Sequence, residues 1–166
     1  MNTLEAKDHI RDLVLRYCRA VDRKDFNALK QQYHQDSIDD HGGMFHGTGA
    51  EFIAWLPTAL AAMKVTSHLV SNHLITIRGH EAEGEVSCVA YHLTHDDQEI
   101  VIGGRYLDKY IFDNDRWQFK HRKIVMDWNQ IGPSSCDLQS PIVAGTPVGA
   151  AFDQDPAHKF FSFLET

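Results

Sequence analysis

The fold is decided by residues 65–77, VTSHLVSNHLITI, the first of four long runs in which extended-chain residues dominate. The other three runs are residues 83–94, 99–112 and 116–128. Short turn-like segments separate them: RGH at 78–80, HDD at 95–97 and DND at 113–115. Long extended runs joined by such turns predict consecutive antiparallel strands. Residues 37–41 and 44–46, on either side of Gly42 and Gly43, predict an additional short hairpin.

Three helices are expected ahead of the long strands. Apolar residues at positions 10, 13, 14, 17 and 21 share one face of a long first helix. Asp25 is the expected N-cap of a short second helix. A third helix is predicted to begin near Gly49 and to break at Pro57, because proline interrupts a helix interior. Helices followed by antiparallel strands indicate an α+β fold.

Length and composition limit the functions to consider. The chain has 166 residues, enough for one domain with a sizeable core, and 43% of them are hydrophobic. Its apolar runs are shorter than the roughly 18 residues of a membrane span, and its polar N-terminus does not predict a signal peptide. Three widely spaced cysteines, at 18, 88 and 136, suggest a reduced compartment. We therefore expect a cytoplasmic protein that does not interact with membranes.

Charge and histidine content argue against two further classes. The net charge is −7, and the only basic run is residues 120–123, which disfavours nucleic-acid binding. The eleven histidines lack the spacing of metal sites. Asp39, Asp40 and His41 suggest a metal site, but neighbouring residues of a strand point to opposite faces. We expect a site without metal or cofactor.

A candidate pocket follows from the alternation of side chains along the strands. Helices packed on a strongly curved sheet form a cone with an open end, and the inward residues of each strand line it. If His68 faces inward, Val70 does too, and His73 faces outward. The other strands then contribute Cys88, His92, Ile102, Tyr106, Arg122, Ile124 and Met126. A mostly apolar lining with few polar groups suits a hydrophobic small molecule.

The candidate chemistry rests on Asp22 and His68. A carboxylate that binds one imidazole nitrogen leaves the other free to accept a proton, which produces a general base. Tyr17 could donate to a leaving hydroxyl or a carbonyl, and Arg122 could hold a developing anion. Each residue also has a structural interpretation. His68 could be a satisfied structural residue, Asp22 could end its helix or pair with Arg19 or Lys24, Tyr17 could belong to the core, and Arg122 could be solvated.

Several segments together resemble the SnoaL-like branch of the nuclear-transport-factor-2-like superfamily. They are YCRAVD at 17–22, DF at 25–26, SHLVSN at 67–72, GGRYLD at 103–108, WQFKHR at 117–122 and MDWN at 126–129. The resemblance covers about residues 4–135. Members of this branch include scytalone dehydratase, a hexachlorocyclohexane dehydrochlorinase and bile-acid 7α-dehydratase.

The resemblance implies a fold and a reaction. The fold is a cone-shaped α+β barrel, with N-terminal helices on a strongly curved, mixed, mostly antiparallel sheet. The reaction is a cofactor-independent β-elimination by an Asp–His dyad, which falls on Asp22 and His68. Tyr17 falls on a tyrosine position of the dehydratases, Arg122 falls on an arginine that assists departure of the leaving group, and His92 falls near a second pocket histidine. The domain is expected to span residues 1–135.

The resemblance also implies an assembly. Trimers are expected, with a dimer as the alternative, and residues 136–166 are expected to form a tail that covers this chain's cavity or a neighbour's. The leading functional hypothesis is a dehydratase-like lyase acting on a hydrophobic cyclic molecule. The alternatives are an isomerase or cyclase with the same base, and a non-catalytic protein that binds a small ligand or serves assembly.

Overall fold

The structure is a computed structural model that describes residues 2–164. Its helices are α1 (Thr3–Asp22), α2 (Phe26–Gln32), α3 (Gly49–Ala59) and the short α4 (Pro156–Phe160), with 3-10 turns at Leu60–Ala62 and Phe152–Gln154. Its strands are β1 (Tyr33–Asp40), β2 (His46–Thr48), β3 (Met63–Arg78), β4 (Glu81–Thr94), β5 (Gln98–Asp113) and β6 (Arg116–Pro133). No helix in the described part of the chain is long and apolar enough to cross a membrane.

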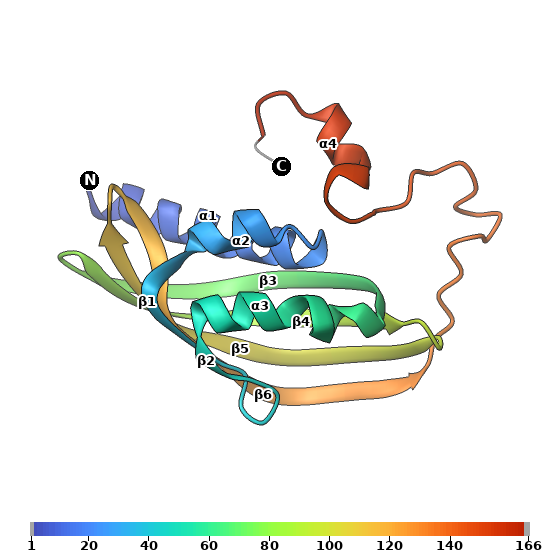
Figure 1. The fold of residues 1–166 in the computed structure, drawn as a ribbon, viewed down its shortest axis with the longest axis horizontal. Coiled ribbons are helices and arrows are strands. Elements are labelled where there is room, and N and C mark those ends of the chain that lie inside the picture. Colours follow the sequence, from blue (N-terminus) through green and yellow to red (C-terminus); the bar gives the residue numbers. More distant parts are fainter. Residues whose placement is uncertain (1, 165–166) are drawn as a thin grey trace.

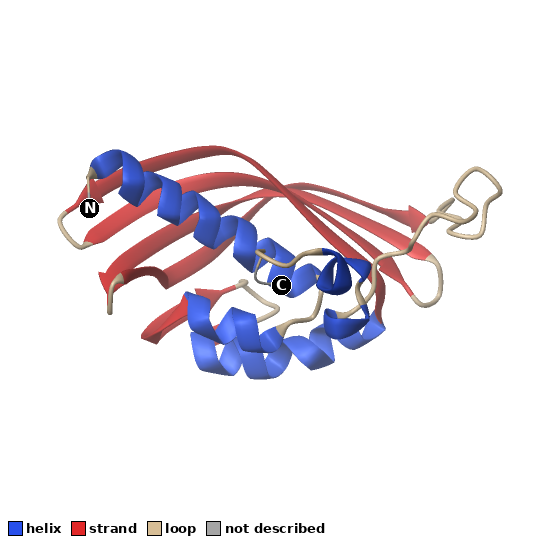
Figure 2. Ribbon diagram, turned by 90° about the horizontal axis from the view of Figure 1, so that it is seen from above, coloured by secondary structure: helices blue, strands red, loops and turns tan. Residues whose placement is uncertain are grey.

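The strands form one mixed sheet in the order β2-β1-β6-β5-β4-β3. β1 runs parallel to β6, and every other neighbouring pair is antiparallel. The sheet is not closed, because β2 and β3 remain its two edges. Figure 1 shows α1 and α2 above the long strands and α3 in front of them, and Figure 2 shows how the strands curve over the helices. The predicted α+β fold is confirmed.

Local sequence explains where α1 begins and which side it buries. The Asn2 side chain accepts hydrogen bonds from the backbone N–H groups of Leu4 and Glu5, and the Glu5 carboxylate accepts one from the Asn2 N–H. This reciprocal capping satisfies donors that a helix start leaves free. The buried side of α1 includes Ile10 and Val14 and faces mainly β3. Asp22, the last residue of α1, thereby comes to lie at β3.

A β-bulge in β3 corrects the predicted alternation of that strand. Val70 pairs with Cys88, but the next pair is His73 with Val86, so β3 contains an additional residue between the two pairs. A bulge of this kind reverses the side to which later residues point. The imidazole of His73 therefore contacts the buried Tyr110 hydroxyl at 3.2 Å, while Leu74 is 72% exposed. The prediction that His73 faces outward is wrong for this reason.

Helix α3 also differs from its prediction. The helix passes through Pro57, continues to Ala59 and then tightens into the 3-10 turn. Proline removes only the one backbone hydrogen bond that its missing N–H would donate, and it stands close to the end of the helix. Burial of Phe52, Ile53 and Leu56 against the core holds the remaining turns in place.

The C-terminal tail packs beside the end of α1 and not over the interior of the sheet (Figure 1). The backbone N–H of Phe152 donates to the Arg23 carbonyl at 2.6 Å, and the Arg23 guanidinium pairs with Asp155 at 3.2 Å. Phe160 and Phe163 are 81% and 98% exposed. Within the described chain, the apolar end of the tail therefore remains uncovered.

We expect Gly104→Ala to destabilise the protein strongly. An added Cβ would lie 2.3 Å from the Val125 carbonyl oxygen, a backbone atom of the neighbouring strand at a β-bulge. Overpacking of this kind costs about 1–3 kcal/mol of unfolding free energy. Gly43→Ala is the matched control, because a Cβ there meets nothing within 4 Å. Urea unfolding measures both variants, and equal midpoints would contradict this account of the bulge.

Candidate active site

An apolar cavity of about 300 Å³ is enclosed by α1, α3 and strands β3 to β6. Most of its lining is aliphatic or aromatic and includes Val21, Phe52, Trp55, Leu56, Leu60, Met63 and Ala90. The polar side chains that line it are few: Tyr17, Tyr106, His41, His68, His92 and Arg105. Cavities of this size and composition bind small, mostly hydrophobic molecules.

Asp22 and His68 meet at the wall of this cavity. The Nδ1 atom of His68 lies 2.6 Å from Asp22 Oδ1, and the backbone N–H of His68 donates to Asp22 Oδ2 at 2.8 Å. Both side chains are nearly buried, at 9% and 10% exposure. Burial disfavours the Asp22 charge, but the hydrogen bonds and charge interaction with His68 lower the pKa of Asp22 below its usual value. Asp22 therefore remains ionised and orients the imidazole.

Because Asp22 binds Nδ1 of His68, Nε2 is the ring nitrogen that remains to act on a bound molecule. Because Nδ1 is the donor to Asp22, the neutral ring carries its free lone pair on Nε2. A proton accepted at Nε2 would create an imidazolium beside a carboxylate, which is favourable where water is largely excluded. The arrangement can thus act as a general base toward a molecule in the cavity.

His92 is the second histidine on this side of the cavity. Its ring is nearly perpendicular to that of His68, with 5.7 Å between the ring centroids. Burial and the nearby His68 lower the pKa of His92 to about 4, so its imidazole is neutral near pH 7. In the described structure, the buried Nδ1 of His92 has no hydrogen-bond partner. A neutral, unsatisfied imidazole is suited to a hydrogen bond with a bound ligand.

Tyr17 and Tyr106 line the cavity above a buried cation, Arg122. The Arg122 side chain has no solvent exposure and binds Asp108 through two hydrogen bonds of 2.8 and 2.7 Å. Its guanidinium carbon lies 4.1 Å from the ring centroids of Tyr17, Tyr106 and Phe119. Burial opposes the charge, but Asp108 raises the pKa of Arg122 well above its usual value.

The structure thus places the sequence-predicted residues in two groups. Eight of them line the cavity: Tyr17, His68, Cys88, His92, Ile102, Tyr106, Ile124 and Met126. Asp22 stands directly behind His68. Val70 packs against the core, and Arg122 lies beneath the cavity where its aromatic neighbours separate it from the cavity surface. Arg122 is therefore not part of the cavity lining.

Helix α3 and His41 also line the cavity, and neither was predicted to do so from the sequence. Phe52 and Leu56 of α3 form part of the cavity wall. His41 was considered only as a metal ligand. It shares a side of the extended chain with Asp39, two residues earlier, whereas Asp40 points away to Lys123 at 3.0 Å. That two-residue spacing is a signal from which the pairing of His41 with Asp39 could have been predicted.

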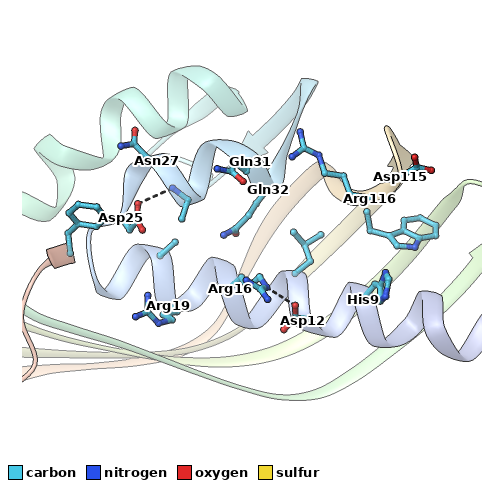
Figure 3. A pocket seen from close by; sticks show the side chains of 15 residues that line it. His9, Asp12, Arg16, Arg19, Asp25, Asn27, Gln31, Gln32, Asp115 and Arg116 are labelled. Carbon is cyan, nitrogen blue, oxygen red and sulfur yellow. Dashed lines mark hydrogen bonds and ion pairs between the residues drawn. The ribbon is translucent and has the colours of Figure 1, made fainter. Parts of the chain in front are cut away.

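A larger, polar groove of about 620 Å³ lies between α1, α2 and the turn that joins β5 to β6 (Figure 3). Three of its charged residues serve local structure: Asp12 pairs with Arg16 at 2.6 Å, and Asp25 accepts the Ala28 N–H as the N-cap of α2. No described imidazole in this groove binds a carboxylate. We therefore assign the candidate site to the smaller, apolar cavity. In residues 2–164, no group of three histidine, cysteine or acidic side chains could hold a metal ion.

Comparison with known proteins agrees with this fold and cavity. Residues 2–123 match the family model of the SnoaL-like domain. A scytalone dehydratase-like protein from Novosphingobium aromaticivorans is 19% identical with a TM-score of 0.72, and the match covers 81% of this chain and 96% of that one. The hexachlorocyclohexane dehydrochlorinase LinA-type3 from Novosphingobium barchaimii is 17% identical with a TM-score of 0.71, covering 81% and 93%.

A third similar structure carries no activity in its description. The Kfla4162 protein from Kribbella flavida is 17% identical with a TM-score of 0.73, and the match covers 78% of this chain and 95% of that one. No curated protein matches the chain. At these identities, the structural similarity shows the fold alone.

We expect Asp108→Ala to be among the most destabilising single substitutions. It would leave the fully buried Arg122 charge without its carboxylate, which costs about 3–5 kcal/mol. Asp12→Ala removes the partner of Arg16 in an exposed pair and should change the unfolding free energy by less than about 0.5–1 kcal/mol. Chemical denaturation compares the two variants. If both variants lost the same small amount of unfolding free energy, Asp108 would not be needed to compensate the Arg122 charge.

Proposed function

Because the chain belongs to the SnoaL-like domain family, we propose that it is a cofactor-independent lyase. It removes a proton and a leaving group from neighbouring carbons of a hydrophobic, cyclic small molecule. The observation that carries this proposal is the Asp22–His68 pair at the wall of an apolar cavity, with a distance of 2.6 Å between Oδ1 and Nδ1.

The base of the reaction is His68 Nε2. It accepts a proton from a carbon that a neighbouring carbonyl or aromatic system has made acidic, while Asp22 stabilises the imidazolium. The two hydrogen bonds from His68 to Asp22 fix both the ring orientation and the strand that carries it. Because the pair is preorganised, little rearrangement is needed when the proton moves.

Tyr17 and Arg122 stabilise the negative charge that develops on the substrate during the reaction. The phenol of Tyr17 lines the cavity and can donate a hydrogen bond to a substrate oxygen. Arg122 lies against the face of Tyr17 and contributes positive potential from below, without touching the substrate. Asp108 compensates much of this charge, so the potential that reaches the cavity is that of the Arg122–Asp108 pair. This is an indirect form of the leaving-group assistance expected for Arg122.

The lining supports a hydrophobic substrate with a small number of polar groups. Cavity walls from Ile102, Ile124 and Met126 offer no hydrogen bonds, whereas Tyr17, His68 and His92 can bind polar atoms of the substrate. The dehydratase-like and dehydrochlorinase structures of the same fold are named for eliminations that release water or hydrogen chloride. Both names are consistent with a lyase.

Two alternatives use the same site. An isomerase or cyclase would use His68 as the base and return the proton elsewhere, without expelling a group. A protein that only binds a small ligand or serves assembly would use the cavity without turnover. Product mass separates these possibilities: elimination lowers it by the mass of water or hydrogen halide, whereas isomerisation conserves it. Binding alone would raise the melting temperature with ligand concentration and yield no product.

We expect His68→Ala to lower turnover of a cyclic or aryl β-hydroxy or β-chloro ketone by at least about 100-fold, because the general base is lost. Mass spectrometry of the product measures the reaction. His95→Ala, in the exposed turn between β4 and β5, is the matched control and should retain the wild-type rate. A folded His68→Ala protein with undiminished turnover would exclude His68 as the base.

We also propose that copies of the chain assemble through the outer face of the sheet. Leu69 alternates with His68, and Val89 lies between Cys88 and Ala90, so both point away from the cavity. They are 62% and 37% exposed, and Trp128 lies over Gly103 on the same outer face with 48% exposure. A contiguous apolar surface of this kind typically marks a protein interface.

Light scattering at micromolar concentration should give a trimer for the wild-type chain. Leu69→Lys should shift the mass toward the monomer, because a lysine ammonium is costly to bury in an apolar interface. Leu4→Lys, at a 73% exposed position near the start of α1, is the control and should leave the mass unchanged. A monomeric wild-type protein would contradict the assembly. A dimer would contradict the trimer expectation while retaining the interface.

A further inference from the structure

A second Asp–His pair, formed by Asp39 and His41, stands at the same cavity. Nδ1 of His41 lies 2.5 Å from Asp39 Oδ1, and the Tyr33 hydroxyl donates to Asp39 Oδ2 at 2.5 Å. The Asp39 side chain has no solvent exposure, and that of His41 is 12% exposed. The His41 ring stacks on Phe52 of α3, with 4.8 Å between centroids. His41 is thus held on one face by packing and at one nitrogen by a carboxylate, as an oriented functional group requires.

The two pairs lie on different strands of the curved sheet. His41 directly follows β1, His68 belongs to β3, and β6, β5 and β4 stand between those strands. Both imidazoles nevertheless line one cavity. Curvature of the sheet therefore directs the two histidines toward a shared space from different walls.

The charged and titratable groups around His41 come from several elements of the fold. Asp39 is the carboxylate in direct contact with it, and Tyr33 is the other titratable group on β1 that touches Asp39. Arg122 of β6 is the register partner of Asp39 and is already neutralised by Asp108. Tyr17 is the titratable group that faces this region from α1. A buried carboxylate stabilises a neighbouring imidazolium, whose Nε2–H remains as the donor that is not bound to Asp39.

We propose that His41 is the general acid of the elimination and that the substrate is accordingly a β-hydroxy compound. This inference rests on the proposed lyase function and deepens it by naming the leaving group. Hydroxide is a poor leaving group unless it is protonated as it departs, whereas chloride leaves without a proton. An oriented acid beside the cavity is therefore expected in a dehydratase and is unnecessary in a dehydrohalogenase.

The proton balance of the step is closed. His68 Nε2 takes the proton from carbon, the electron pair of that C–H bond forms the new C=C bond, and the C–O bond breaks. The departing oxygen takes the proton from His41 Nε2 and leaves as water. The enzyme ends with His68 protonated and His41 neutral, and exchange of one proton with solvent restores both.

Tyr17 is a weaker candidate for this acid. Burial raises the pKa of the Tyr17 phenol far above its usual value, so the phenol releases a proton only reluctantly. It remains a good hydrogen-bond donor to a substrate oxygen. Asp39 is a positioning residue in this scheme, because it acts only through His41.

The first experiment measures the protonation of His41 by ¹⁵N NMR of histidine-labelled protein. We expect Nδ1 and Nε2 of His41 to both carry a proton in part of the molecules at pH 7, and Asp39→Asn to reduce that fraction, because the adjacent carboxylate is lost. A His41 ring without this doubly protonated form from pH 5 to 8 in the wild-type protein would overturn the proposal. So would a doubly protonated fraction that does not respond to Asp39→Asn. This measurement requires no substrate.

The second experiment uses two probes that differ only in the leaving group. They are 4-hydroxy-4-phenylbutan-2-one and 4-chloro-4-phenylbutan-2-one, and both eliminate to the same enone, followed by its ultraviolet absorbance. His41→Gln should lower the rate for the hydroxy probe at least about 100-fold more than for the chloro probe, the effect of a lost general acid. In the wild-type protein, the rate for the hydroxy probe should fall at high pH, where the acid loses its proton. His41→Gln should remove this fall.

The possible outcomes separate this proposal from the lyase proposal. Equal losses on both probes, or a wild-type protein that consumes only the chloro probe, would overturn the role of His41 while leaving a lyase. Turnover that is independent of His68 would instead remove the lyase mechanism. If neither probe reacts, the NMR result alone supports or overturns the protonated state of His41 on which the proposal depends.

Discussion

The buried Arg122–Asp108 ion pair is the constraint on which the cavity depends. A guanidinium without solvent exposure must have its charge compensated, and Asp108 does so with two short hydrogen bonds from the adjacent strand. The three aromatic rings that pack on Arg122 come from α1, β5 and β6. Two of these rings, Tyr17 and Tyr106, are also part of the cavity wall. The pair therefore joins helix and sheet beneath the site and sets the electrostatic potential of the wall.

Above this pair, the chain combines apolar packing with a few oriented polar groups. Because the cavity lining is mostly apolar, a hydrogen bond or charge within it has more effect than it would in bulk solvent. Asp22 and Asp39 each bind the Nδ1 of one histidine and leave its Nε2 as the second nitrogen. His92, neutral because it is buried, adds a group that can donate or accept without charge. In the proposed mechanism, His68 serves as the base and His41 as the acid, and each is oriented by its own carboxylate.

Particular residues show how far the sequence could be interpreted. The inward positions on β4 and β5, such as Cys88 and Ile102, were predictable because both strands keep a regular ladder across the cavity. His73 was not, because the β3 bulge inserts a residue that no local pattern marks. The burial of Arg122 was equally hidden: its neighbours in sequence are polar or basic, and Asp108, which neutralises it, lies 14 residues earlier on another strand.

The sequence by itself determined the order of helices and strands, since these depend on apolar periodicity, caps and turns within a few residues of each position. It also indicated an apolar pocket with few polar groups. Only the tertiary structure decided which carboxylate meets which imidazole. Asp22 lies 46 residues from His68, and His41 reaches the same cavity from the end of β1, which three strands separate from β3. Sheet curvature, bulges and the packing of α1 set those distances, and they are properties of the assembled fold.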